Sequence, residues 1–179
     1  MDLTAVLEFI TDKEIYEKVI CGRIPKAKKF LWLASSNVKD LHVDKQGKMV
    51  PFLEVLSDVV KKKVEVRLLH AKEPGPAFRR DFDKYPNLIK GMERVLCPRV
   101  HIKSVIIDGE FAYTGSANLT GAGMGAKTAG KRNFESGIIT DDKGIVARIM
   151  EQFDRIWRGE HCRECKRKEF CADYKDLLL

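Results

Sequence analysis

A β-hairpin near the middle of the chain constrains the fold most strongly. Two runs rich in β-branched and aromatic residues, 100–107 and 111–114, lie on either side of the dipeptide Asp108-Gly109. This dipeptide is favoured in the tight turns that join antiparallel strands. The segment therefore predicts two adjacent antiparallel strands in the middle of a larger sheet.

Further strands and helices alternate along the rest of the chain. A capping box, Thr11 to Glu14, should start one helix, a second should begin near Pro51, and a long amphipathic helix should close the pattern. The other predicted strands lie at residues 30–34, 64–68 and 136–140. This order predicts an α/β fold, with a mixed β-sheet flanked by helices around one core.

The charge of the chain favours an anionic partner. The formal net charge is +7, and residues 61–120, with twelve basic and seven acidic side chains, carry +5 of it. A positive middle third suits nucleic acid or a phospholipid headgroup. A charge-rich surface of the kind found in thermophilic proteins would give the same count.

Two features bear on the location of the chain. No run of eighteen apolar residues occurs and the first residues contain no basic segment, which predicts neither a membrane span nor a cleaved secretory signal. The cysteine count is five, an odd number, and three of them lie in one short tail segment. This usage predicts a reducing, cytoplasmic location instead of a disulfide framework.

A pattern of polar residues overlaps the hairpin and reads H-x-K-x4-D-x6-G-S-x-N, from His101 to Asn118. His101 and Lys103 are two apart on the predicted strand, so their side chains should project from one face. Lysine supplies positive charge for phosphate oxygens, and histidine can act as a nucleophile or proton carrier near neutral pH. The pair indicates a phosphate site.

Other residues of the pattern fit the same chemistry. Gly115 would let backbone approach a ligand, Ser116 offers a hydroxyl, and the Asn118 amide can donate to a phosphoryl oxygen. Downstream, Glu135 could accept the second N–H of His101 and so fix its tautomer.

The pattern resembles the HKD signature of the phospholipase D superfamily. The resemblance extends to Asn133-Phe134-Glu135 and to a closing helix with Phe153 and Trp157, and it covers most of residues 20–158. We therefore expect a single phospholipase D-like domain over residues 1–158, with one HKD motif, followed by a basic, Cys-rich tail over residues 159–179.

The resemblance implies a metal-independent phosphodiesterase that forms a phosphohistidine intermediate and uses no cofactor for catalysis. Carried onto this chain, His101 is the nucleophile or the acid, Lys103 and Asn118 bind phosphate, Ser116 assists, and Glu135 orients His101. Asp108 belongs to the motif as well. Asp108 is five positions after Lys103, so on a strand its side chain would point to the opposite face, and it lies in the inferred turn. Its predicted role is therefore structural.

The mechanism needs a second histidine from another copy of the motif. His70-Ala71-Lys72 repeats H-x-K, but no Asp or G-S-x-N follows at the required spacing, and we interpret His70 as a surface residue. The simplest solution is a homodimer in which two His101 residues share one site.

The sequence is compatible with three classes of function. Small single-motif endonucleases of the superfamily are similar in size, which together with the charge favours cleavage of DNA or RNA. A phospholipase or phosphatidyl-transfer enzyme is the first alternative, since the superfamily contains both. A nucleic-acid-binding module without turnover is the second.

The tail contains a candidate metal site. A C-x2-C pair, Cys162 and Cys165, is followed by Cys171 and preceded by His161, a set that could hold zinc. An iron–sulfur cluster with Cys21 or Cys97 as the fourth ligand is the redox variant. Three ordinary thiols on a basic segment would show the same spacing.

Overall fold

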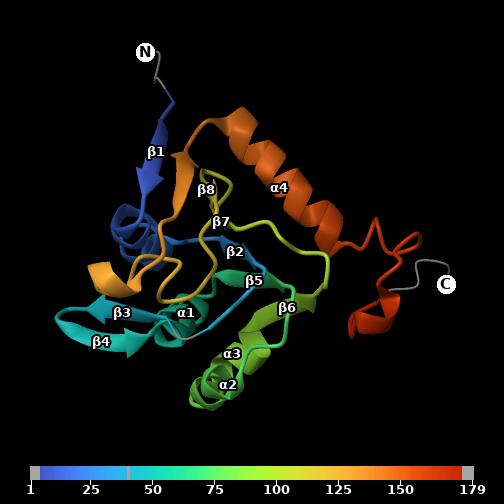
Figure 1. Ribbon diagram of the computed structural model, residues 1–179, viewed down its shortest axis with the longest axis horizontal. Coiled ribbons are helices and arrows are strands. Elements are labelled where there is room, and N and C mark those ends of the chain that lie inside the picture. The colour runs from blue at the N-terminus through green and yellow to red at the C-terminus, as the bar shows by residue number, and fades with distance from the viewer. Residues whose placement is uncertain (1–4, 40, 175–179) are drawn as a thin grey trace.

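In a computed structural model, which describes residues 5–39 and 41–174, a seven-stranded mixed sheet forms the centre of the molecule (Figure 1). Its spatial order is β1-β9-β8-β7-β2-β5-β6. The β2, β5 and β6 strands run parallel to one another, and the other pairs are antiparallel. The strands are β1 (Leu7–Thr11), β2 (Phe30–Ser35), β5 (Glu65–His70), β6 (Met92–Leu96), β7 (Ser104–Ile107), β8 (Phe111–Gly115) and β9 (Ser136–Thr140). The predicted α/β fold with a mixed sheet is confirmed.

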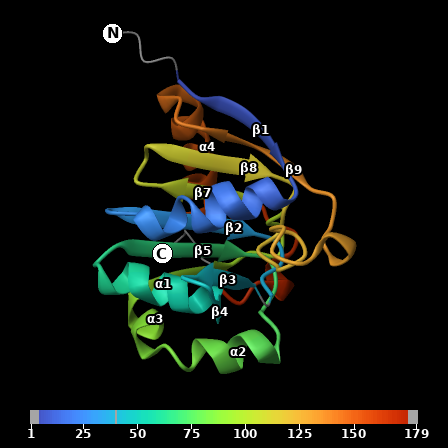
Figure 2. The same ribbon diagram turned by 90° about the vertical axis from the view of Figure 1, so that its left-hand side faces the viewer.

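Helices cover both faces of this sheet, and a small hairpin of two strands lies beside it (Figure 2). The hairpin consists of β3 (His42–Lys45) and β4 (Lys48–Pro51). The helices are the π-helix η1 (Ile15–Cys21), the 3-10 helices η2 (Ile24–Lys26), η3 (Ala129–Lys131) and η4 (Lys168–Phe170), and the α-helices α1 (Phe52–Lys61), α2 (Pro76–Phe82), α3 (Pro86–Gly91) and α4 (Lys143–Trp157). No helix in the described ranges is long and apolar enough to cross a membrane.

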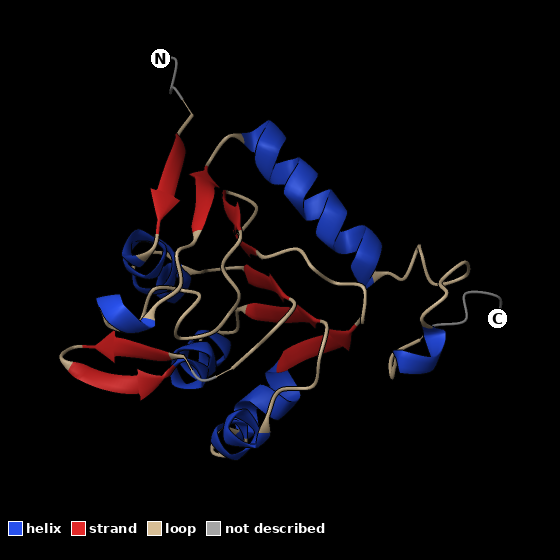
Figure 3. Cartoon of the chain, in the orientation of Figure 1, coloured by secondary structure: helices blue, strands red, loops and turns tan. Residues whose placement is uncertain are grey.

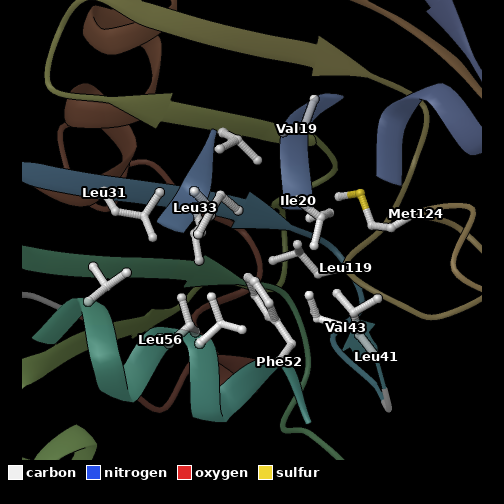
Figure 4. Close-up of a cluster of buried hydrophobic side chains, with 14 of the residues drawn as sticks. Val19, Ile20, Leu31, Leu33, Leu41, Val43, Phe52, Leu56, Leu119 and Met124 are labelled. Carbon is white, nitrogen blue, oxygen red and sulfur yellow. The ribbon is translucent and has the colours of Figure 1, made fainter. Parts of the chain in front are cut away.

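The larger core lies on the face that η1 and α1 cover (Figure 4). The predicted capping box forms only in part before η1: the Thr11 backbone N–H donates to Glu14 Oε2 at 3.0 Å, but the N-cap of the helix is Glu14, which has no side-chain cap. Leu31 and Leu33 of β2 point into this core, together with Ile20 and Phe52. Because this packing fixes the position of β2, it also fixes the position of the polar residues that follow the strand.

The opposite face of the sheet packs against α4. Phe153 stacks between Trp32 and Trp157, at ring-centroid distances of 5.1 and 5.7 Å. Such stacked aromatic rings hold a helix firmly on a sheet. The helix begins at Asp142, whose side chain accepts a hydrogen bond from the Ile145 backbone N–H.

The central hairpin is present, but its first strand is shorter than predicted. The turn contains Asp108 at φ 58° and Gly109 at φ 73°, the left-handed conformations that tight hairpin turns require. The strand β7 starts only at Ser104, so residues 101–103 form a loop (Figure 3). The reason is that Ala34, the last residue of β2 that pairs with β7, lies opposite Ser104.

The interpretation of His70 as a surface residue is wrong. His70 ends the parallel strand β5 between two neighbouring strands, where it is buried, and its Nδ1 lies 2.8 Å from the Lys72 carbonyl oxygen. Burial lowers the pKa of His70. A neutral ring that donates to a backbone carbonyl is a structural group.

Candidate active site

The residues of the HKD pattern meet at one edge of the large sheet. There β2 and β8 end, and β7 and β9 begin. The Gly115 backbone N–H donates to the Lys103 carbonyl oxygen at 3.2 Å, and the Ser116 backbone N–H donates to the Ser136 carbonyl oxygen at 2.9 Å. These two bonds join the segments that carry the predicted site residues.

His101 and Lys103 form the centre of the site. The Lys103 ammonium nitrogen lies 3.0 Å from His101 Nδ1 and 3.4 Å from Nε2, and it donates to the His101 carbonyl oxygen at 2.6 Å. An ammonium group can only donate, so the ring nitrogen that it contacts carries a lone pair. The imidazole itself is exposed, whereas Lys103 is buried with 5% of its surface accessible.

The charge of Lys103 is therefore held in a poorly solvated position. Burial lowers the pKa of Lys103, and the carboxylate of Glu135 acts against that shift. A desolvated ammonium group beside an exposed imidazole attracts an anion more strongly than a solvated surface lysine does. The predicted pairing of the two side chains holds although neither residue lies in a strand.

Asn118 is held by residues that follow β2. Its Oδ1 accepts hydrogen bonds from the Ser36 hydroxyl at 2.8 Å and the Asn37 backbone N–H at 3.2 Å, while the nearby Ser35 hydroxyl donates to the Asn37 carbonyl oxygen at 2.7 Å and accepts from the Leu119 backbone N–H at 2.9 Å. Because a backbone N–H can only donate, the oxygen must be on this side of the amide. The two N–H groups of Asn118 then point the other way and can donate to a ligand. Ser35 and Ser36, which the sequence marks only as the end of a strand, are thus positioning residues.

Ser116 and Glu135 form a hydrogen-bonded pair. The Ser116 hydroxyl donates to Glu135 Oε2, and Asn133 Nδ2 donates to Oε1 at 3.1 Å. Asp12 fixes this segment, because its side chain accepts from the Glu135 backbone N–H at 2.9 Å. The expected hydrogen bond from His101 to Glu135 is not formed within the described chain, where the two carboxylate oxygens bind Ser116 and Asn133.

Glycine is needed at position 115 for a different reason from the predicted one. A β-carbon at this position would lie 2.7 Å from Gly137 Cα and would also collide with the Ser136 carbonyl and the Tyr113 hydroxyl. Gly115 therefore permits close contact between β8 and β9, not the approach of a ligand. Tyr113 is fully buried behind it, and burial raises the pKa of Tyr113 to about 12.

Asp108 holds two loops together, as its predicted structural role requires. Its carboxylate accepts hydrogen bonds from the backbone N–H groups of Lys28 at 3.0 Å, Lys29 at 2.7 Å and Phe30 at 3.0 Å. These bonds tie the hairpin turn to the start of β2. The turn is at the end of β7 away from His101, so the carboxylate does not face the site.

Replacing Asp108 with alanine should therefore reduce stability and not the chemical step. Loss of an acceptor that serves three backbone donors is expected to lower the free energy of unfolding by about 2–3 kcal/mol. Urea unfolding measures the loss, and the rate per folded molecule should change less than threefold. Glu110→Ala, which removes a neighbouring acid in an exposed ion pair with Lys29, should cost under about 0.5 kcal/mol. A large fall in rate with unchanged stability would contradict the structural role.

The predicted zinc site of the tail is not supported. Within residues 5–39 and 41–174, no group of three or more His, Cys, Asp and Glu side chains is placed to hold a single metal ion. His161 is exposed. Cys21 lies in η1, where the Tyr16 hydroxyl and the acid Asp44 are its neighbours.

At one edge of the mixed sheet, the fold thus gathers an exposed histidine, a buried lysine and an oriented asparagine amide, a set of groups that can bind a phosphoryl group. Residues 20–157 match the family described as cardiolipin synthase, PLD-like domain. This chain thus belongs to the phospholipase D-like family. A search of the curated proteins finds no match.

Solved structures with the same fold include two small bacterial proteins. NucT from Helicobacter pylori is 16% identical, with a TM-score of 0.64 over 86% of this chain and 96% of its own. Nuc from Salmonella typhimurium, a phospholipase D family member, is 16% identical, with a TM-score of 0.61 over 86% of this chain and 95% of its own. The archaeal chromatin protein TrmBL2, which binds DNA, is 16% identical, with a TM-score of 0.58 over 85% of this chain and 52% of its own.

Proposed function

We propose that this protein is a metal-independent phosphodiesterase, and specifically an endonuclease that hydrolyses DNA or RNA. The observation that carries the proposal is the arrangement at His101. Its exposed imidazole is in contact with the ammonium group of Lys103, and the Asn118 amide is held with its donors turned away from the protein. This arrangement offers a nucleophile and two kinds of donor for one phosphoryl group.

The reaction we propose has two steps. A ring nitrogen of His101 attacks phosphorus, a P–N bond forms, the P–O bond to the leaving group breaks, and a second histidine gives its proton to the leaving oxygen. Water then attacks phosphorus, the second histidine takes a proton from it, and the P–N bond breaks. Lys103 and Asn118 neutralise the charge on the phosphoryl oxygens in both steps.

The charges near the site favour a polyanionic substrate. The loop that leads to Glu135, residues 121–133, contains Lys127, Lys131 and Arg132 and no acidic residue. A row of cations beside the site suits the regularly spaced phosphates of a nucleic acid. The DNA-binding chromatin protein among the structural neighbours is in line with this substrate class. The family description, which names cardiolipin synthase, favours phospholipid as the second candidate.

A side-by-side assay in EDTA tests the substrate class. We expect cleavage of single-stranded DNA, duplex DNA or RNA and no release of headgroup from phosphatidylcholine vesicles. Cleavage of nucleic acid should weaken steeply between 50 and 200 mM salt, because bound phosphates release counterions (about 10³–10⁵-fold for six to ten contacts). Headgroup release alone would establish the lipid enzyme. Binding of nucleic acid without any cleavage would establish the binding module.

We further propose that the second histidine comes from a second copy of the chain. The face of the sheet beyond α4 exposes Leu7 at 62%, Phe9 at 67% and Ile138 at 37%, and Phe9 lies directly opposite Ile138 in the strand register. Adjacent exposed apolar side chains of this kind mark interaction surfaces. The surface continues into the site, because β9 starts at Ser136, whose backbone N–H donates to Ser116.

Introducing a charge at Phe9 should weaken the dimer and, with it, the activity. Loss of a buried phenylalanine contact is worth about 1.5–3 kcal/mol, so Phe9→Asp should raise the dimer dissociation constant about 10- to 100-fold. Analytical ultracentrifugation measures the constant, and activity should recover as protein concentration rises. Met49→Asp, at an apolar residue of β4 that is 54% exposed, is the matched control. A fully active monomer would overturn the shared site.

A further inference from the structure

Four of the five cysteines line one cavity. Cys97 comes from the loop that follows β6, and Cys162, Cys165 and Cys171 come from the tail. The cavity has a volume of about 520 Å³ and lies between these two segments and the α4 helix, which contributes Arg148 and Arg155 to its wall. Cys97 is 65 residues before Cys162, so the fold and not the sequence spacing brings the four thiols together.

The tail is fixed to the loop around Cys97 by three hydrogen bonds. The Leu96 backbone N–H donates to Asp173 Oδ2 at 2.7 Å, and the Cys171 thiol donates to the Leu96 carbonyl oxygen at 3.4 Å. The Arg167 guanidinium donates to the Pro98 carbonyl oxygen at 3.3 Å. The residues on both sides of Cys97 are thus in contact with the tail, which lies beside this loop in Figure 1.

The side chains of residues 160–170 differ in their exposure. Every residue from 160 to 170 is exposed except Cys162 and Cys165, which are half-buried against the cavity. Between residues 160 and 170, these two cysteines are therefore the side chains that are partly buried, and both line the cavity.

One thiol of the tail faces a backbone donor. The Arg167 backbone N–H donates to Cys165 Sγ at 3.4 Å. An N–H group directed at sulfur stabilises the thiolate, the form that ligates metals.

We propose that Cys97, Cys162, Cys165 and Cys171 ligate a four-iron, four-sulfur cluster. Four cysteine thiolates are the ligand set that such clusters use, and each thiol gives up its proton when it binds iron. A single zinc ion would need all its ligand sulfurs about 2.3 Å from one point, and no three potential ligands in the described chain are grouped in that way. A cluster is larger than one ion and its thiolates stand further apart, which suits a cavity of about 520 Å³.

The cluster would connect the tail to the active site through a short loop. Cys97 is four residues before His101, and Arg99 and Val100 between them line the same cavity. Ligation of Cys97 would therefore fix the loop that carries the nucleophile. The assignment of the four ligands does not depend on the proposed nuclease activity, because iron and sulfide can be counted without any substrate.

The metal content of the full-length protein tests the proposal. Protein purified without oxygen should contain about four iron atoms and four sulfides per chain and show a broad visible absorption band that dithionite bleaches. Each of Cys97→Ser, Cys162→Ser and Cys165→Ser should lose at least half of the iron. Circular dichroism of each variant checks that the sheet and helices are still folded.

Two matched variants separate this ligand set from its alternatives. Cys21→Ser removes the thiol of η1, and His161→Ala removes the remaining potential ligand of the tail; both should keep the iron content of the wild type. The proposal would be overturned if the protein contained zinc alone, or if it contained no metal and its tail thiols were oxidised to disulfides. Equal iron content in Cys97→Ser and Cys21→Ser would also overturn it. Loss of the cluster in His161→Ala with retention in Cys97→Ser would overturn it as well.

Discussion

Replacing His101 with alanine is expected to lower the rate of diester cleavage by more than about 10²–10⁴-fold. That range is the usual cost of losing general acid–base catalysis alone, and this substitution also removes the nucleophile. In a symmetric dimer both histidines of the shared site are lost at once. The measurement is kcat/KM on a nucleic-acid substrate in EDTA, so that no contaminating metal-dependent nuclease contributes.

The matched control for this substitution is His161→Ala. His161 is exposed in the tail and makes no hydrogen bond to a residue of the HKD pattern within the described chain, and its loss should leave the rate within about twofold. The His101 imidazole is exposed, and within the described chain Lys103 is the side chain that it hydrogen-bonds, so His101→Ala should remain folded. A His101→Ala protein with at least a tenth of the wild-type rate would refute the proposed mechanism.

A mixture of wild-type and His101→Ala chains then tests whether the site is shared. If both histidines of a dimer are needed, random exchange in an equal mixture leaves about a quarter of the dimers with two intact copies. The activity per wild-type chain should therefore fall to about half of its value in the unmixed protein. Activity proportional to the wild-type chains would instead mean that each chain works alone.

The sequence predicts the centre of the fold better than its margins. The alternation of apolar runs places β2, β5, β8 and β9, and the Asp108-Gly109 turn places the hairpin, because these are local signals. The strand β1 is not predicted. Its residues Leu7 and Phe9 are exposed, so its pairing with β9 leaves no alternation of the kind that a half-buried strand shows.

The HKD motif can be read from the sequence because one hairpin fixes its spacing, whereas the residues that support the motif cannot be read in this way. Ser35 and Ser36 reach Asn118 from more than eighty residues away in the chain, and Asp12 reaches Glu135 from 123 residues away. Such contacts follow from the order of strands in the sheet, which no local pattern contains. The same holds for Cys97, whose place beside the tail depends on where β6 ends.

Replacing Asn118 with aspartate is expected to lower kcat by about 10²–10³-fold, the usual cost of removing one donor from a site that stabilises developing negative charge. An aspartate has nearly the same shape, and its oxygen can still accept from Ser36 and from the Asn37 backbone N–H. What changes is the outward-facing half of the group, where a carboxylate oxygen replaces two N–H donors. Because the new charge also repels phosphate, KM should rise together with the fall in kcat.

Two further variants show whether the fall in kcat comes from the missing N–H donors, or from the added negative charge or a change in the fold. Gln46→Glu adds the same negative charge in the β3–β4 turn and should leave kcat unchanged. Ser36→Ala removes one of the two bonds that orient Asn118, and since the bond from the Asn37 backbone N–H remains, kcat should fall only about 3- to 10-fold. Thermal melting of all three variants checks that the fold persists. If Asn118→Asp retains its kcat, the amide does not contact the phosphoryl group, and the site must bind its diester through Lys103 alone.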